Sequence, residues 1–199
     1  GRAVAQLLAP RMGRTLLIAR DRARLERVLS EIRIDGTIEA PVDISTEIAD
    51  LRHADVVVTV TSSGGNLVKA GMLRAGSVVC DVSRPRDVSL KVSRARDDVL
   101  VIDGGLVRVP GEVDFGFDYG LPADLTYGCV AETMTLAFEH MFEDYSLGKE
   151  LSIDQVRWID ARAAEHGFEL AALRSFEHRL DDAVIQKVRA RAHAGGRDE

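Results

Sequence analysis

Four short apolar segments, separated by stretches with helical spacing, constrain the fold of this chain more than any other feature of its sequence. The segments are 15–19 (TLLIA), 54–61 (ADVVVTVT), 77–82 (SVVCDV) and 99–103 (VLVID). Uninterrupted apolar runs of this length, rich in β-branched residues, are typical of strands covered on both faces. Strands that alternate with helices need right-handed crossover connections. The pattern therefore predicts an α/β fold with a doubly wound, mostly parallel sheet.

The helical segments are identified by apolar residues that recur every three or four positions. Residues 21–32 have this spacing, and residues 67–73 form a shorter predicted helix that ends near Gly76. Residues 1–9 also have it, with no strand before them. A helix that opens such a sheet without its strand indicates that the first strand is missing. We therefore expect the sequence to be a fragment that has lost its start.

Composition excludes several classes of function. The chain has 199 residues, with 46% hydrophobic and 29% charged, as in an ordinary soluble globular protein. Its formal net charge of −6 argues against nucleic-acid binding. No apolar run approaches the roughly 20 residues that a membrane span needs. Two cysteines make no disulfide framework, which favours a cytoplasmic protein, and the five histidines show no metal-ligand spacing.

A second region follows the segment 111–120, which is rich in Gly, Asp and Phe. Three helices are predicted there, over residues 129–145, 152–165 and 170–191. Ser152 begins the second of them, and Gln155 follows three residues later, as in a capping box. The sheet is thus expected to be followed by a C-terminal helical segment.

Two residues near the start fit a dinucleotide site of the Rossmann type. In such a unit the last glycine of the fingerprint lets a helix pack closely, and the pyrophosphate lies at that helix's N-terminus. Gly1 fits this last position. Arg20 directly follows the strand 15–19, where an acidic residue usually binds the ribose of NAD; an arginine suits the 2′-phosphate of NADP. The alternative is that Arg20 belongs to a solvated Arg-Asp-Arg loop.

Small and polar residues follow the other three predicted strands. They are Thr61 and Ser62, then Ser83, then Gly104 and Gly105. Ligands of open α/β sheets bind outside the carboxyl ends of the strands, and small residues there allow close approach of a cofactor. Each segment alone is also compatible with an ordinary turn, but together they predict a crevice for NADPH.

Cys129 lies at the start of the predicted helix 129–145. The thiolate is the reactive form of cysteine, and a helix N-terminus favours it. His140 lies on the same face, but eleven residues at about 1.5 Å each place it roughly 16 Å away, too far to act as a base. Two interpretations stay open: a nucleophile, or a small buried hydrophobic residue. Cys80, inside the segment 77–82, is expected to be of the buried kind.

The segment YGCVAETMTLAFEHMFEDYSLGKELSIDQVRWIDARAAEHGFEL, residues 127–170, resembles the C-terminal part of cyanobacterial long-chain acyl-[acyl-carrier-protein] reductases. The similarity continues upstream through LLIARDRARLERV, ADVVVTVTSS and VLVIDGGLV, so that it covers residues 1–179. The resemblance implies an enzyme that uses NADPH to reduce a fatty acyl thioester to a fatty aldehyde through an acyl-cysteine. The thioester partner would be acyl carrier protein or acyl-CoA.

The same resemblance implies roles for individual residues. The matching C-V-A-E context assigns the catalytic cysteine to Cys129. The residues implied for the NADPH site are Arg20, Thr61, Ser62, Ser83, Gly104 and Gly105. We therefore predict an NADP-binding domain over residues 1–125, truncated at its N-terminus, C-terminal helices that carry Cys129 over residues 126–194, and a disordered tail over residues 195–199.

Two features leave other functions open. The region that precedes the Rossmann unit in that family is absent from this sequence. The segment SSGGNLVKAGMLRAGSVVCDVSRPRDV, residues 62–88, equally resembles glutamyl-tRNA reductases and shikimate dehydrogenases. One alternative is therefore an NAD(P)-dependent dehydrogenase of that group that acts on another carbonyl or alcohol. The other is a non-catalytic nucleotide-binding module.

Overall fold

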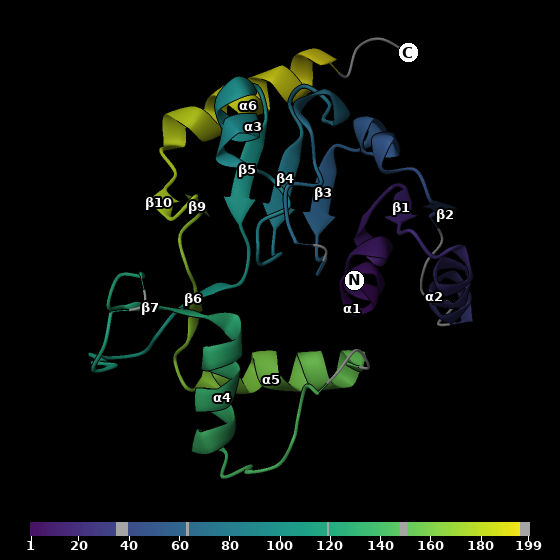
Figure 1. Ribbon diagram of the computed structural model, residues 1–199. Helices are drawn as coiled ribbons and strands as arrows, with labels where there is room; N and C mark the ends of the chain where they lie inside the picture. The colour runs from purple at the N-terminus through teal and green to yellow at the C-terminus, as the bar shows by residue number, and fades with distance from the viewer. Residues whose placement is uncertain (35–39, 63, 119, 148–150, 196–199) are drawn as a thin grey trace. The chain divides into compact units, whose positions relative to one another are not determined.

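A computed structural model describes residues 1–34, 40–62, 64–118, 120–147 and 151–195 (Figure 1). The chain divides into two compact units. Unit 1 comprises Gly1–Ile102 and the C-terminal residues from Leu180, and unit 2 comprises Asp103–Arg179. The domain boundary predicted at residue 125 stays a prediction, and the contacts within the chain divide it differently.

Parallel strands form the centre of unit 1. One sheet pairs β1 (Thr15–Ile18) with β2 (Val42–Ser45). The other has the order β3 (Val56–Thr59), β4 (Val78–Asp81) and β5 (Leu100–Asp103). β3 and β4 pair in parallel, with Val57 opposite Val79. The predicted α/β fold with parallel strands is thus confirmed.

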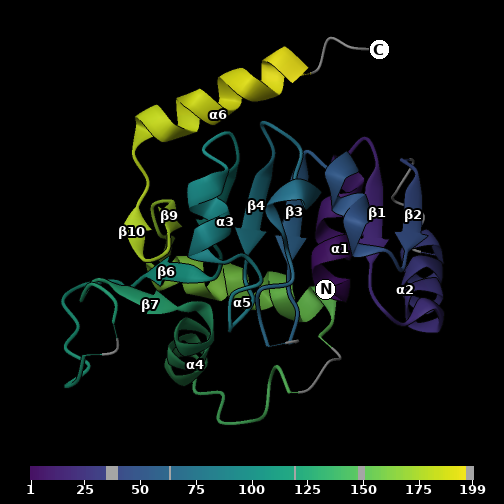
Figure 2. The same cartoon turned by 45° about the horizontal axis from the view of Figure 1, so that its top comes forward.

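The helices of unit 1 are α1 (Arg2–Leu8), α2 (Arg22–Ile34), α3 (Leu90–Ala95) and α6 (Asp182–Gly195), with 3-10 turns η1 (Ala9–Arg11), η2 (Ile48–His53) and η3 (Ala70–Met72). Of these helices, α2 connects β1 to β2 and α3 connects β4 to β5, whereas α1 precedes β1 and α6 follows the residues of unit 2. α6 runs past the edge of the sheet at which β4 and β5 start (Figures 1 and 2). A Cβ atom on Gly76, just before β4, would collide with the backbone of Ala192 in α6. The absent side chain therefore lets α6 pack onto the sheet.

The α/β core of unit 1 follows the apolar spacing of the sequence. Ile32 of α2 is completely buried and packs with Val42 of β2 and with Ala5 and Ala9 from the first helical segment. A second set of buried valines lies on and beside the sheet of β3 to β5: Val57, Val68, Val79, Val88 and Val101. Burial of each such side chain contributes about 1.5–3 kcal/mol.

Unit 2 is built around a small antiparallel sheet with the strand order β7-β6-β8. Its elements are β6 (Leu106–Arg108), β7 (Leu125–Tyr127), α4 (Gly128–Phe138), α5 (Ile153–Glu165), β8 (Glu169–Leu170), β9 (Arg174–Ser175) and β10 (His178–Arg179). Val109, Ala131 and Phe168 form one of its small apolar cores. Among the described residues of either unit, no helix has the length and apolar character that crossing a membrane requires.

Three predicted helices differ from the structure. Residues 67–73 form no α-helix: Val68 forms a bridge with Val88, and the 3-10 turn η3 follows, where the Arg96 guanidinium donates to the carbonyls of Ala70 and Leu73. The helix predicted over residues 170–191 is instead β8, the hairpin β9–β10, and α6. Positive φ angles of 48° at Phe176 and 72° at Glu177 turn the chain there, which no helix tolerates.

The helix predicted over residues 129–145 ends at Phe138. His140 adopts the left-handed conformation, with φ of 55°. Its N–H donates to the carbonyl of Ala137 at 3.1 Å, and the N–H of Met141 donates to that of Leu136 at 2.9 Å. These two bonds form a Schellman motif, which usually has glycine at this position. Because this position has histidine instead of glycine, the sequence does not indicate that the helix ends here.

The helix predicted over residues 152–165 is confirmed as α5, including its capping box. Gln155 N–H donates to Ser152 Oγ at 3.1 Å, and Ser152 N–H donates to Gln155 Oε1 at 3.0 Å. The sequence did not predict β2, α3, β6 or β7. Of the predicted disordered tail 195–199, Gly195 is the last residue of α6, and residues 196–199 lie outside the described residues.

Candidate functional site

Asp81 holds together the carboxyl ends of β3 and β4 in unit 1. Its side chain is almost fully buried, with 1% of the residue exposed. Oδ1 accepts hydrogen bonds from the Thr59 hydroxyl at 2.9 Å and from the Ser83 N–H at 3.0 Å. Oδ2 accepts from the Val88 N–H at 2.9 Å. A buried carboxylate needs such donors to offset its desolvation.

Asp87 continues the same network. It is fully buried, and its carboxylate accepts from the Thr61 hydroxyl at 2.9 Å and from the Ser83 hydroxyl at 2.7 Å. The Thr61 N–H in turn donates to Ser83 Oγ at 2.9 Å. The structure therefore brings together the predicted site residues Thr61 and Ser83, and their hydroxyls bind Asp87 of the protein itself.

The loops that follow β3 and β4 are also joined through their backbones. The Asn66 N–H donates to the carbonyl of Arg86 at 2.8 Å, and Val68 pairs with Val88 as a parallel bridge. Gly65 has a φ of 88°, and a Cβ atom there would lie 2.7 Å from the Arg86 carbonyl oxygen. Only glycine meets both demands.

The other residues predicted for the cofactor site are divided between the two units. A Cβ atom on Gly1 would lie 3.5 Å from Val60 Cγ2, so Gly1 lies at the same strand ends as Thr61. Arg20 and Ser62 are exposed, as the solvated-loop alternative for Arg20 expects. Gly104 and Gly105 belong to unit 2.

Cys129 is the second residue of α4 and is exposed, so the interpretation as a buried hydrophobic residue is wrong. The Gly128 N–H donates to the carbonyl of Gly105 at 2.7 Å, which places the predicted residues Gly105 and Cys129 close together. The Thr133 hydroxyl donates to the Cys129 carbonyl at 3.0 Å. The thiol is thus accessible at the first turn of the helix. Cys80, expected to be buried, is half-buried.

Neither His140 nor His166 lies at the end of α4 that carries this thiol. His140 lies beyond the C-terminal end of α4, whereas the sequence placed it inside a helix over residues 129–145. His166 Nε2 lies 2.7 Å from Glu139 Oε1 at that same end. The ten residues from Cys129 to Glu139 correspond to about 15 Å along the axis. An accessible thiol alone does not define an active site.

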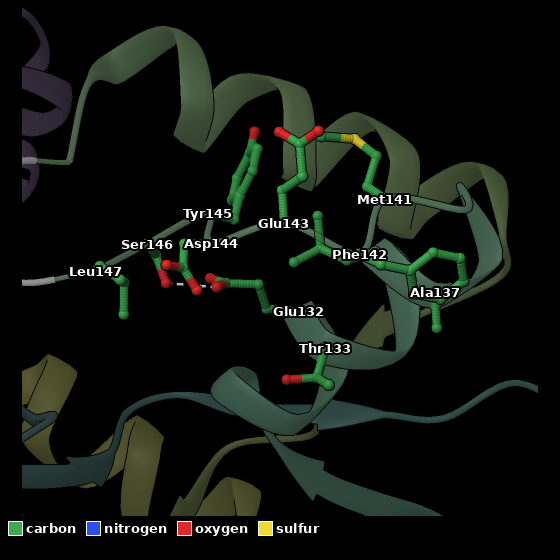
Figure 3. Close-up of a pocket in the computed structure, with 11 residues that line it drawn as sticks. Glu132, Thr133, Ala137, Met141, Phe142, Glu143, Asp144, Tyr145, Ser146 and Leu147 are labelled. Carbon is green, nitrogen blue, oxygen red and sulfur yellow. Dashed lines mark hydrogen bonds between the residues drawn. The ribbon is translucent and has the colours of Figure 1, made fainter.

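A groove with a volume of about 350 Å³ lies between α4 and the segment that follows it (Figure 3). We call it the α4 groove. It is lined by Glu132, Thr133, Leu136, Ala137, Met141, Phe142, Glu143, Asp144, Tyr145, Ser146 and Leu147. The sequence did not predict this groove, because the Schellman motif that turns the chain back along α4 carries no glycine.

Hydrogen bonds fix the far wall of the α4 groove. The Ser146 hydroxyl donates to Glu132 of α4. The Tyr145 hydroxyl donates to the Gln155 carbonyl at 2.9 Å, and Gln155 Nε2 donates back to the Tyr145 carbonyl at 2.9 Å. The ring of Tyr145 lies 5.5 Å from that of Trp158. The groove is therefore anchored to both α4 and α5.

Comparison with known proteins gives a different functional class from the one predicted. No protein-family model matches the chain. The curated protein "Aminotransferase PigE" from Serratia sp. (strain ATCC 39006) is 35% identical over 157 residues. The alignment covers 76% of this chain and 18% of PigE. The chain thus spans less than a fifth of the length of this relative.

This similarity corrects the predicted function. The assignment to acyl-[acyl-carrier-protein] reductases, the reduction of an acyl thioester to an aldehyde and the NADPH cofactor are wrong, because the relative is named for amino-group transfer, which needs neither thioester nor hydride donor. The dehydrogenase and nucleotide-binding alternatives gain no support from it. The roles of single residues, Cys129 included, and the carrier-protein or acyl-CoA partner stay predictions.

Proposed function

We propose that this chain is one region of a longer protein that transfers amino groups, and that it binds substrate there rather than the cofactor. The observation that carries the proposal is the alignment of three quarters of the chain with a small part of an aminotransferase. An alignment over 18% of a protein leaves ample chain elsewhere for a catalytic domain.

Aminotransferases depend on pyridoxal phosphate, which a lysine amine holds covalently while a carboxylate or arginine faces its ring nitrogen. Such a lysine is desolvated, because burial keeps its amine uncharged and nucleophilic. The described lysines Lys69, Lys91 and Lys187 are all exposed, and Lys187 pairs with Asp97. None of these three fits the cofactor. Lys149 lies outside the described residues.

The described residues do offer a place for a substrate. The α4 groove is open, mostly apolar, and lined by a few polar groups, as small-molecule sites are. In the buried network around Asp81 and Asp87, by contrast, the hydroxyl groups donate hydrogen bonds to these two carboxylates of the protein. Unit 2 therefore carries the better binding surface.

The test compares this chain with the longest natural protein that contains it. Both are incubated with pyridoxal phosphate, a panel of amino-acid donors and aliphatic aldehyde acceptors, and the amine product is measured by mass spectrometry. We expect transfer by the long protein and none by the chain alone. A long protein that binds the cofactor but aminates no acceptor would overturn the proposal.

Cofactor placement is tested separately by borohydride reduction and peptide mapping. We expect no stoichiometric lysine adduct on this chain. Lys149→Ala serves as the control, because it removes the one lysine outside the described residues. A stoichiometric adduct that this variant abolishes would place the cofactor here and contradict the proposed division of roles.

We also propose that β1 to β5 belong to one doubly wound sheet of the Rossmann type. The parallel pairings β1–β2 and β3–β4 support this, as does the closeness of Gly1 to Val60 at the end of β3. Such a sheet makes β1 and β3 neighbours. Backbone NOEs between these two strands would test it, and their absence in an assigned spectrum would contradict it.

A further inference from the structure

We propose that the α4 groove binds a primary alkylammonium ion, with the ammonium group against its carboxylates and the alkyl chain against its apolar residues. As a statement about binding, the proposal depends on the groove alone. As a statement about substrate class it rests on the proposed function, because amines are what an aminotransferase consumes and produces.

The first argument is charge. The charged residues that line the groove are Glu132, Glu143 and Asp144, and all three are acidic. Glu132 accepts a hydrogen bond from Ser146, whereas Glu143 and Asp144 are exposed and form no ion pair with another described residue. Negative charges that line one groove repel one another, and a bound cation would reduce this repulsion.

The neighbouring tyrosine responds to the same field. Burial and, after it, the charge of Glu132 raise the pKa of Tyr145 above its ordinary value of 10.0. Figure 3 shows Glu132 and Asp144 extending toward the same side of the groove, beside Ser146. Glu143 extends away from these two side chains in the same view, so Glu132 and Asp144 are the acids that share one side of the groove.

The second argument is the apolar lining. Leu136, Ala137, Met141, Phe142 and Leu147 also line the groove. Phe142 and Leu147 are 80% and 69% exposed, which is costly for side chains of this size. An alkyl chain laid across them removes this area from water. A hydrated metal ion gains nothing there, and no described group of His, Cys, Asp or Glu is arranged to hold one.

The third argument is size and preorganisation. A volume of about 350 Å³ lies at the lower end of the range for small-molecule sites. The Schellman motif at His140 and the paired hydrogen bonds of Tyr145 with Gln155 hold the groove open before any ligand arrives. Binding therefore needs little ordering of the protein, which favours affinity for a small ligand.

The experiment titrates the isotopically labelled chain with n-hexylamine, hexanoate and 1-hexanol, and follows backbone NMR shifts. These probes share a chain length and differ in charge. We expect hexylamine to bind at least tenfold more tightly than hexanoate, with shifts confined to residues of the groove. Each surface ion pair contributes up to about 1 kcal/mol. Glu143→Gln/Asp144→Asn should therefore weaken hexylamine roughly three- to twentyfold and leave hexanol unchanged.

Glu112→Gln is the matched control, because Glu112 is an exposed acid of unit 2 outside the groove. It should leave all three affinities unchanged. Butylamine should bind more weakly than hexylamine by roughly two- to fourfold for each methylene lost, because a fully buried methylene contributes about 0.8 kcal/mol. Equal affinity for hexylamine and hexanoate, or a double variant that binds hexylamine as the parent does, would overturn the proposal.

The two proposals fail in different ways. If the long protein transfers amino groups but hexylamine does not bind this groove, the groove has been assigned the wrong ligand and the proposed function stands. If hexylamine binds with the expected charge dependence but the long protein transfers no amino group, the binding site stands and the proposed function is wrong.

Discussion

The strand ends of unit 1 and the α4 groove of unit 2 use the same residue types for opposite purposes. At the strand ends, Asp81 and Asp87 are buried; Asp81 accepts hydrogen bonds from a hydroxyl and two N–H groups of the protein, and Asp87 accepts from two hydroxyls. In the groove, Glu143 and Asp144 are exposed, and the apolar residues beside them face water. The strand ends thus have their acceptors satisfied by the protein, whereas Glu143 and Asp144 form no ion pair with another described residue, which is why we propose a ligand for the groove.

The largest expected effect comes from removing one of the buried carboxylates. Asp81→Ala leaves the donors of Thr59, Ser83 and Val88 without their acceptor, and an orphaned buried group costs about 1–3 kcal/mol. We expect a loss of roughly 3–5 kcal/mol in the free energy of unfolding, measured by urea denaturation.

The matched variant in unit 2 is Asp144→Ala. It removes an exposed carboxylate that forms no ion pair with a described residue, so stability should change by less than about 0.5 kcal/mol. If both substitutions lowered the free energy of unfolding equally, the carboxylate of Asp81 would be no more important for stability than that of Asp144, which would contradict the comparison.

The next effect tests the joined loops of unit 1. In Gly65→Ala the new methyl group would lie 2.7 Å from the Arg86 carbonyl oxygen, and the residue would keep a φ of 88°. We expect a destabilisation of about 2–4 kcal/mol by thermal or urea unfolding. Gly64→Ala is the control: its φ is 85°, but nothing lies within 4 Å of the new atom, so only backbone strain of about 1 kcal/mol is expected. A Gly65 variant no worse than the Gly64 variant would argue against the close contact.

A smaller effect concerns the ion pair that fixes η3. Arg96 Nε donates to Asp98 Oδ1 at 2.7 Å, and this hydrogen bond lowers the pKa of Asp98 below its ordinary value of 3.8. Because the folded pKa is the lower one, the stabilisation is complete above about pH 5 and is lost as the pH falls below 3.8 through that lowered pKa. Asp98→Asn should cost about 1–2 kcal/mol near neutral pH.

The pH dependence separates charge from shape in this pair. Unfolding free energies of the parent and Asp98→Asn should converge only once the pH is below the lowered folded pKa of Asp98, since its carboxyl is uncharged there in both the folded and the unfolded state. A difference that stays constant down to the most acid pH would mean that packing, not the carboxylate charge, stabilises the turn.

Much of unit 1 was predictable from the sequence because its signals are local. Buried β-branched runs predicted four of its strands, and α2 followed from apolar spacing within one segment. The capping box of α5 in unit 2 was predicted from an equally local pattern. Unit 2 was harder because its decisive features are not local. The reversal at His140 uses a residue that rarely stops a helix, and the turn at Phe176 and Glu177 carries no glycine or proline.

The functional sites divide in the same way. Thr61 and Ser83 were placed correctly at neighbouring strand ends, but their hydrogen bonds to Asp87 depend on a loop that the sequence does not orient. The α4 groove needs Glu132 and Asp144, twelve residues apart, to be brought together by a turn and by anchoring to α5. No spacing in the sequence reports such an arrangement.

The smallest expected effect links the stability of α5 to the groove. Ser152→Ala removes the N-cap acceptor of the capping box and should cost about 1 kcal/mol in unfolding free energy. The same substitution releases one constraint on Gln155, whose Nε2 donates to the Tyr145 carbonyl in the groove wall. We therefore expect hexylamine to bind two- to threefold more weakly, with NMR shift changes at residues 145 and 146.

Ser152→Thr is the control, because it keeps a hydroxyl acceptor at the N-cap and should restore both stability and affinity. If Ser152→Ala lowers stability while hexylamine affinity stays at the parent value, the anchoring to α5 stabilises the fold without shaping the groove. The shape of the groove would then depend on the Schellman motif and on the hydrogen bond from Ser146 to Glu132. Like the strand ends of unit 1, the groove would be held by hydrogen bonds between residues close to it.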